Sequence, residues 1–292
     1  MAMDWSPFGL CGSVLRCRNR CLWSSGRRIG PDFPHRPLAV RLKEVDVNMA
    51  GQSSTGTSAT RRLGILVILM LAALALCGLW FSAEDVVQGS TVRIMYIHVP
   101  SIWTAYIAFG LTALCSGVYL SGKNRSLAWD RVAGAAGEIG VLFVAVSLVT
   151  GSMWGRLTWG TYWVWDARLT STAFLFITYV GYLAVRQLGG THRQRARRSS
   201  VLALLAILEI PLVHFSVTLW RSLHQEASVA NPNAKVELDG LMLFSLFLGL
   251  VAFTMLFVWL VLHRQRVMML EDAFSDRGLD VAITARRNEA GV

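Results

Sequence analysis

Charged residues are scarce in this chain of 292 amino acids. They make up 16% of it, against about 25% in an average soluble domain, whereas hydrophobic residues reach 54%. Acidic residues are the rarer kind, with 18 Asp and Glu against 28 Lys and Arg. This balance argues against an ordinary soluble domain and favours a membrane protein with a net positive charge.

Cysteines are also few, and their positions exclude two kinds of site. Cys11, Cys17 and Cys21 lie near the start, and Cys77 and Cys115 lie in apolar stretches. No second pair at metal-ligand spacing accompanies the first three, so they do not predict a zinc site. With so few, scattered cysteines, no disulfide framework is expected.

The two ends of the chain lack hydrophobic periodicity. Residues 1–60 are rich in Arg, Pro, Gly and Ser and are too polar to contain the apolar region of a signal peptide. They are either a disordered cytoplasmic leader or translated upstream sequence, with the true start at Met49, where "MAGQSSTGTSATRRLG" reads as an ordinary N-terminus. Residues 264–292 mix acidic and basic side chains, which predicts a cytoplasmic tail with at most one amphipathic turn.

Between these ends, long apolar runs dominate the sequence. A membrane-spanning helix needs about 20 mainly apolar residues, and backbone polar groups in lipid must be satisfied within each segment. Residues 61–263 are therefore expected to form an all-α domain, a transmembrane bundle of six helices. The six spans are expected near Leu63–Phe81, Ile102–Leu120, Val132–Ser152, Leu169–Gln187, Val201–Trp220 and Leu241–Leu262.

Basic residues alternate from one connection to the next, which predicts the topology. They concentrate before span one, between spans two and three, between spans four and five, and after span six. By the positive-inside rule, both termini are cytoplasmic and the loops 82–101, 153–168 and 221–240 face outward. The net charge of +10 thus follows topology and does not indicate nucleic-acid binding.

The outward face collects two histidines and a tryptophan-rich stretch. His98 precedes the second span, His224 follows the fifth, and "TWGTYWVWD" (158–166) lies between them in the chain. The tryptophans are either a lipid-facing aromatic belt or an aromatic floor for a flat cofactor. Each histidine is either a structural hydrogen-bonding group or a ligand, and imidazole is a usual axial ligand of haem iron.

If this stretch is a short interfacial helix, its side chains divide between two faces. Trp159 and Trp163 would share a face, with Trp165 turned by about 200° from Trp163. Arg156 and Arg168 flank the stretch and could pair with carboxylates such as haem propionates. Three roles are open for the neighbouring acid, Asp166: it could pin the loop, pair with Arg168, or orient a hydrogen-bond donor.

Ionisable residues lie in the interior of the apolar spans. Glu138, Glu209 and His214 are functional candidates by position, because charges inside a membrane are costly. An interhelical hydrogen bond near a kink at Pro211 would explain Glu209 and His214 equally well. His192 and His263 lie among arginines and are expected to be solvated.

Three separated motifs resemble one family of membrane proteins. The stretch "WGTYWVWDARLTS" (159–171) resembles the WGxxWxWD signature of the haem-handling, or WWD-domain, proteins of cytochrome c maturation. "RIMYIHVPSIW" (93–103) and "VHFSVTLWRSLHQ" (213–225) look like the two histidine segments of the haem-handling protein C (CcmC) family of the bacterial System I pathway. The resemblance covers Arg61 to Arg266. Relatives often carry Trp-Trp where Leu219–Trp220 stand here, and Lys-Pro where Arg156–Leu157 stand.

The resemblance implies a site for haem b at the outer membrane face. His98 and His224 match the two axial iron ligands of the family. The matching positions of the platform, in a periplasmic WWD loop, are Trp159, Gly160, Trp163, Trp165 and Asp166.

The resemblance also implies a function and partners. The protein would bind haem in the bacterial inner membrane and present it to a membrane-anchored periplasmic haem chaperone, with ABC transporter subunits and a small single-span protein as further partners. It would be a delivery protein rather than an enzyme. One alternative is a haem lyase that attaches haem to apocytochrome c, and another is a solute permease with an aromatic vestibule.

Overall fold

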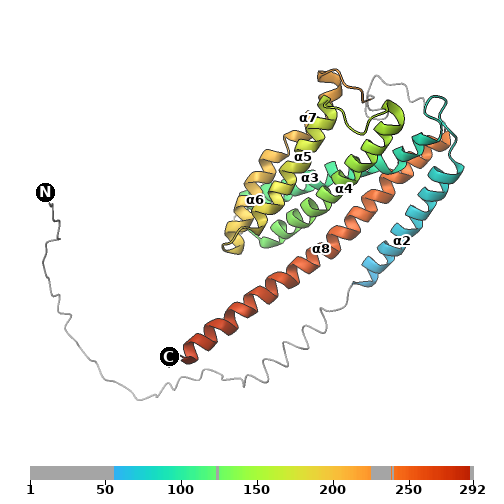
Figure 1. Ribbon diagram of the computed structural model, residues 1–292. Coiled ribbons are helices and arrows are strands. Elements are labelled where there is room, and N and C mark those ends of the chain that lie inside the picture. Colours follow the sequence, from blue (N-terminus) through green and yellow to red (C-terminus); the bar gives the residue numbers. More distant parts are fainter. Residues whose placement is uncertain (1–55, 123–124, 225–237, 239, 290–292) are drawn as a thin grey trace, which may run out of the picture. The chain divides into compact units, whose positions relative to one another are not determined.

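The chain folds as a bundle of α-helices in the computed structural model, which describes residues 56–122, 125–224, 238 and 240–289 (Figure 1). Most of the predicted leader, the three cysteines in it and the proposed start at Met49 lie outside the described residues, as does most of the loop 221–240. The helices in chain order are α2 (Ser58–Leu74), α3 (Met95–Ser121), α4 (Leu127–Trp159), α5 (Ala167–Gln187), α6 (His192–Ala206), α7 (Glu209–Leu219) and α8 (Gly240–Glu289). A π-helical segment, η1 (Ala75–Phe81), extends α2, and a 3₁₀ segment, η2 (Ser90–Ile94), leads into α3.

The prediction of a six-span bundle is confirmed. Within the described residues, six helical segments are long and apolar enough to cross a membrane, the longest running from Gly240 to Glu289. α2 with η1, η2 with α3, and α6 with α7 each form one of these segments.

Polar side chains mark where several helices begin. The hydroxyl of Thr57 accepts a hydrogen bond from the backbone N–H of Thr60 at the start of α2, and Asp166 accepts one from Leu169 at the start of α5. Thr191 and Gln194 form a reciprocal capping box at the start of α6. Such caps satisfy N–H groups that have no partner within the helix, so they determine where each helix starts.

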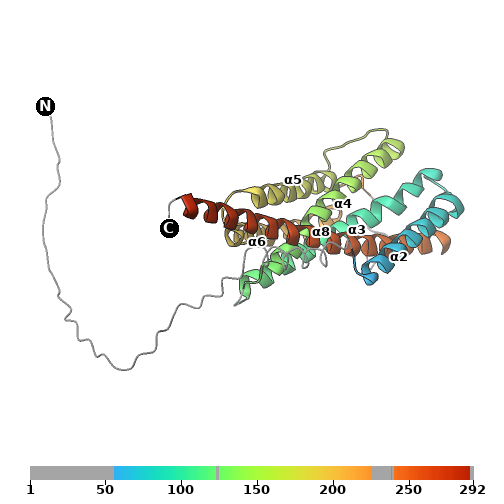
Figure 2. The same ribbon diagram turned by 90° about the horizontal axis from the view of Figure 1, so that it is seen from below.

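The centre of the bundle is the contact between α3 and α4, and α8 packs on both (Figure 1). The first half of α4 presents small residues at this contact, so large rings lie directly against its backbone. A Cβ on Gly140 would lie 2.5 Å from Phe109 of α3, and at the contact with α5 one on Gly137 would lie 2.7 Å from Tyr182. α5 packs in turn on α4 and on α6 (Figure 2).

The fifth span is not one helix, in contrast to the continuous stretch predicted over Val201–Trp220. α6 ends at Ala206 and α7 begins at Glu209. Pro211 has no N–H to donate to the carbonyl of Ile207, and that carbonyl instead accepts from Ile210 at 3.2 Å. The kink expected at Pro211 is therefore an interruption of the α-helix at Ile207 and Leu208, about one turn earlier.

The C-terminal segment is also different from the prediction. α8 continues through residues 264–289 as regular helix, so the expected limit of one amphipathic turn is wrong. Carboxylates of this segment pair with arginines of other helices: Asp272 contacts Arg131 of α4 at 3.4 Å and Arg195 of α6 at 3.2 Å. These contacts between helices are made by charged residues, so the pattern of apolar residues does not predict them.

Successive spans run in alternating directions, so the bundle has two ends (Figure 1). We call the end where α4 and α7 finish and α3 and α5 begin the His98 end. The other end, where α5 finishes and α4 and α6 begin, is the Arg186 end.

Candidate functional site

His98 is held against α4 at the His98 end. It lies in the first turn of α3 and not, as predicted, in a loop before the helix. Its Nδ1–H donates to the backbone carbonyl of Ser147 at 3.0 Å, and the hydroxyl of Thr150 lies 3.2 Å from the same nitrogen. A Cβ on Gly151 would lie 2.8 Å from the ring, so the close approach of His98 to α4 requires a residue without a side chain at this position. With Nδ1 protonated, the lone pair of Nε2 is available to a ligand or metal.

His224 lies opposite this ring. The ring centroids of His98 and His224 are 6.4 Å apart, with an angle of 36° between the planes. The backbone N–H of His224 donates to the hydroxyl of Ser222 at 3.1 Å, and that hydroxyl donates to the carboxylate of Asp166. Because Asp166 also caps α5 through its other oxygen, at 2.8 Å from the N–H of Leu169, one carboxylate connects the tryptophan-rich stretch with the segment that carries His224.

The tryptophans come from two kinds of structure, and the expected interfacial helix over them is absent. Trp159 is the last residue of α4, and Gly160 ends that helix in the left-handed region (φ +78°). Trp163 and Trp165 follow in the non-helical connection to α5, edge to face at 5.7 Å. A glycine adopts this positive φ without strain, so the helix stops here and the shared helix face of Trp159 and Trp163 does not exist.

Exposure separates the three indoles. Trp159 lies 6.5 Å from the ring of His224 and is 36% exposed, whereas Trp165 is 84% exposed. The indole nitrogen of Trp163 is buried and has no hydrogen-bond partner among the described residues. The structure thus brings Trp159 to the histidine pair, leaves Trp165 on the surface, and leaves a buried donor on Trp163.

The two arginines that flank the stretch point to different partners. The guanidinium of Arg156 donates to the carbonyl of Gly160 and lies 5.7 Å from the ring centroid of Tyr162. Arg168 donates to the backbone carbonyl of His214 at 2.9 Å, and its Nε is buried without a partner in the described part of the chain. Neither arginine pairs with Asp166 in the ion pairs between described residues, so of the three roles considered for Asp166, pairing with Arg168 is not realised.

Sequence reasoning missed the contribution of α4 to the site. Trp154 meets His98 edge to face, with centroids 5.8 Å apart, and its indole N–H donates to the side chain of Gln88 at 2.9 Å. Ser147, Thr150, Gly151 and Trp154 share one face of α4 at helical spacing, the signal that could have identified them. The predicted span ended at Ser152, so this face was divided between helix and loop.

The two glutamates inside the spans form contacts between helices, whereas the ring of His214 packs on its neighbour in the same helix. Glu138 of α4 accepts two hydrogen bonds from Arg264 of α8, at 2.5 and 3.1 Å. Glu209 of α7 accepts one from Thr178 of α5 at 2.8 Å, which confirms the interhelical hydrogen bond considered for it. The ring of His214 packs edge to face on Phe215 at 5.0 Å.

Fold and site together define a polytopic helical membrane protein with an imidazole pair beside an aromatic cluster at one end of its bundle. A family model described as heme exporter protein C (CcmC) matches residues 50–278. The chain belongs to this family, which confirms the resemblance found in the three motifs.

Curated relatives cover most of the bundle. The heme exporter protein C of Bradyrhizobium diazoefficiens is 40% identical over 207 residues, 70% of this chain and 76% of that protein. The protein of the same name from Haemophilus influenzae is 36% identical over 211 residues, 71% of this chain and 83% of that protein. A putative cytochrome c biosynthesis ccmC-like mitochondrial protein of Arabidopsis thaliana is 33% identical over 239 residues, 80% and 89% of the two chains.

Proposed function

We propose that this protein binds haem between His98 and His224 and presents it to a membrane-anchored periplasmic haem chaperone for cytochrome c maturation. Membership of the heme exporter protein C family supports a role in haem handling. The relative from Arabidopsis, whose name refers to cytochrome c biosynthesis, supports the pathway. In this proposal haem is cargo, and the protein is a binding and delivery protein rather than an enzyme.

The observation that carries the proposal is the separation of the two imidazoles. A bond from a metal ion to an imidazole nitrogen is about 2.0–2.1 Å long, so two such nitrogens on opposite sides of one ion are about 4 Å apart. The ring centroids, which lie behind the nitrogens, are then about 6 Å apart. The observed 6.4 Å agrees with this spacing, and the donor set is the one that haem iron commonly takes.

The surrounding residues have separate tasks in this proposal. The carbonyl of Ser147 fixes the tautomer of His98, so that Nε2 carries the lone pair. Asp166, acting through Ser222, positions the backbone of His224. The indoles of Trp159, Trp163 and Trp165, with Gly160 at the turn, form the platform for the macrocycle. Arg156 and Arg168 are the candidates for the propionates, for which they would have to leave or extend their present contacts.

Delivery requires that the cargo can leave. Two neutral imidazoles bind iron through exchangeable bonds, and a ligand from the chaperone can replace one of them. The 84% exposure of Trp165 supports an open platform, from which one edge of the macrocycle remains accessible to a partner. ABC transporter subunits and a small single-span protein are the further partners that we propose.

The proposed location is the bacterial inner membrane, with the His98 end at the periplasmic face and both termini in the cytoplasm. The distribution of basic residues supports this orientation. Arg131, Arg195 and Arg264 lie at the Arg186 end, as the positive-inside rule requires of a cytoplasmic face.

Substitution of the two histidines tests the ligand assignment. We expect His98→Ala/His224→Ala protein, purified from cells that make haem, to lose nearly all of its haem content and the absorption of six-coordinate haem. His192→Ala, at the Arg186 end, is the matched control and should keep both. Wild-type haem content and spectrum in the double variant would show that these histidines are not the ligands.

Co-purified partners distinguish presentation from the alternative functions. Haem together with a haem-loaded chaperone supports presentation. Bound apocytochrome c without a chaperone would instead indicate a haem lyase, and a protein without haem would indicate a solute permease.

A further inference from the structure

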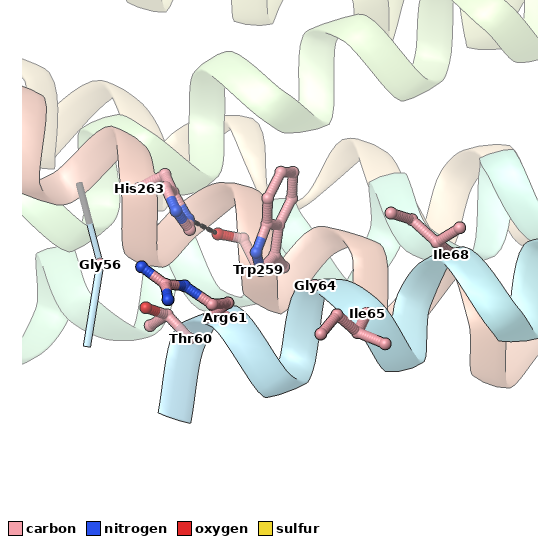
Figure 3. Close-up of a pocket in the computed structure, with 8 residues that line it drawn as sticks. All are labelled: Gly56, Thr60, Arg61, Gly64, Ile65, Ile68, Trp259 and His263. Atoms are coloured by element: carbon pink, nitrogen blue, oxygen red, sulfur yellow. Dashed lines mark hydrogen bonds between the residues drawn. The ribbon is translucent and has the colours of Figure 1, made fainter. Parts of the chain in front are cut away.

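A cavity lies at the Arg186 end, between the start of α2 and the middle of α8 (Figure 3). Its volume is about 290 Å³, and no residue of the proposed haem site takes part in it. Arg61 and His263 extend toward the same opening beside Gly56 in this view. The haem proposal therefore leaves this cavity unexplained.

The cavity carries positive charge without matching carboxylates. Arg61 lines it, and Nη1 of Arg266 reaches its rim, 3.5 Å from the hydroxyl of Thr60. Neither arginine forms an ion pair with a carboxylate in the described part of the chain, and the first turn of α2 has no acidic residue. The positive end of the α2 helix dipole lies beside the cavity and adds to the positive potential.

Three other arginines at the same end differ from Arg61 and Arg266, because carboxylates neutralise them. Arg264, two positions before Arg266, forms ion pairs with Glu138 and Glu271. Arg131 and Arg195 share Asp272. Arg61 and Arg266 are thus not neutralised within the described part of the chain, unlike these three arginines.

The floor of the cavity is aromatic and offers hydrogen-bonding groups. The indole of Trp259 lies on Gly64, where a Cβ would be 2.8 Å from the indole nitrogen. His263 donates from Nδ1 to the carbonyl of Trp259 at 2.8 Å, which directs Nε2 away from that helix backbone (Figure 3). His263, predicted to be solvated, is thus a lining residue. Charge, an indole and an imidazole together favour a phosphate group at a membrane boundary.

One wall of the cavity continues as an apolar surface. Ile65 and Ile68, on the α2 side, are 55% and 67% exposed. The span that contains α2 is strongly apolar, and only 17% of it is buried inside the protein. This surface therefore faces lipid, and a ligand seated at Arg61 would extend hydrocarbon along it.

We propose that this cavity binds the phosphate headgroup of an anionic phospholipid. Arg61 and Arg266 contact the headgroup, and the acyl chains lie along Ile65 and Ile68. Basic pockets between membrane helices bind anionic headgroups in this way. A free phosphate ion would contact the same arginines, but it would make no contact with the adjoining apolar wall.

The test compares two lipids on the purified full-length protein. After delipidation, the protein is titrated with phosphatidylglycerol or phosphatidylcholine, and bound lipid is counted by native mass spectrometry. We expect a preference for phosphatidylglycerol of about tenfold, and its loss in Arg61→Ala/Arg266→Ala. Arg62→Ala removes an adjacent exposed arginine that does not line the cavity, so this control should keep the preference.

Three results would overturn the proposal. The double variant could keep the preference, although it elutes and melts as the wild type does. Arg62→Ala could lose the preference equally, which would mean diffuse attraction instead of a site. Inorganic phosphate, at the concentration of the lipid phosphate, could displace phosphatidylglycerol, which would indicate a free anion as the ligand. Haem content is measured in parallel, so a failure of the haem proposal is recognised separately.

Discussion

The two ends of the bundle are held by different chemistry. Every ion pair among the described residues lies at the Arg186 end, including the buried pair of Asp130 and Arg186 with contacts of 2.7 and 3.1 Å. At the His98 end, the polar side chains bond mainly to backbone carbonyls and hydroxyls. Two aspartates illustrate the contrast. Asp130 accepts a hydrogen bond from the guanidinium of Arg186, whereas Asp166 accepts one from the hydroxyl of Ser222.

This difference agrees with the proposed tasks of the two ends. A buried, doubly bonded ion pair resists rearrangement, because separating it would leave charges in a medium of low polarity. The hydrogen bonds cited at the His98 end each have at least one neutral partner, so exchanging them does not separate a pair of opposite charges. The Arg186 end is therefore suited to fixing the helices, and the His98 end to holding ligands that must accept and release cargo.

The largest expected effect is on stability, at the Arg186 end. Asp130→Ala leaves Arg186 buried and unpaired, against the backbone of Gly134. We expect the free energy of unfolding to fall by about 3–5 kcal/mol, seen as a lower melting temperature in detergent. Asp272→Ala, which breaks pairs with partly exposed arginines, is the control and should cost about 1 kcal/mol or less. Equal melting temperatures for the two variants would contradict this distinction.

A smaller effect, on binding and not on stability, is expected at the His98 end. In Gly151→Ala the new methyl group would displace the ring of His98, since no space exists between them. Changes in the groups that orient a metal ligand typically weaken binding 10–100-fold, and we expect about that loss of haem affinity. Gly110→Ala in α3 is the matched control, because nothing lies within 4 Å of its added Cβ. The idea fails if both variants titrate with haem as the wild type does.

The smallest effect is expected for the hydroxyl between Asp166 and His224. Ser222→Ala removes the hydroxyl that links the Asp166 carboxylate to the backbone of His224, but this hydroxyl touches neither imidazole, so haem affinity should fall only about three- to tenfold. Asp166→Asn keeps a good cap for α5 and should add little to Ser222→Ala when the two are combined. Ser171→Ala, whose hydroxyl bonds within its own helix, is the control. Additive losses from Asp166→Asn and Ser222→Ala would mean that the two side chains act separately.

Much of the architecture was predictable, because the length of an apolar run predicts whether it can cross a membrane as a helix. Six apolar runs predicted six spans, and counting them brought His98, His224 and the tryptophans to one end. The family signature around Asp166 added specificity that composition does not contain.

Helix boundaries and side-chain partners were less predictable. His98 and Trp159 lie inside helices, because α3 and α4 extend beyond their apolar cores into the polar boundary region. The continuation of α8 to Glu289 depends partly on the ion pairs of Asp272 with α4 and α6. The local sequence does not predict these pairs, because their partners lie far away in the chain. The pairing of Asp130 with Arg186 was missed for the same reason, since 56 positions separate them.

By itself, the sequence determined the number of spans, the distribution of basic charge and the order of the three motifs, since these depend on residue type and spacing along the chain. The tertiary structure alone decided which groups meet. It set the 6.4 Å between the rings of His98 and His224, the close approach of Gly151 to His98, and the cavity at Arg61. Such distances depend on how whole helices pack, and packing is a property of surfaces assembled from residues far apart in the chain.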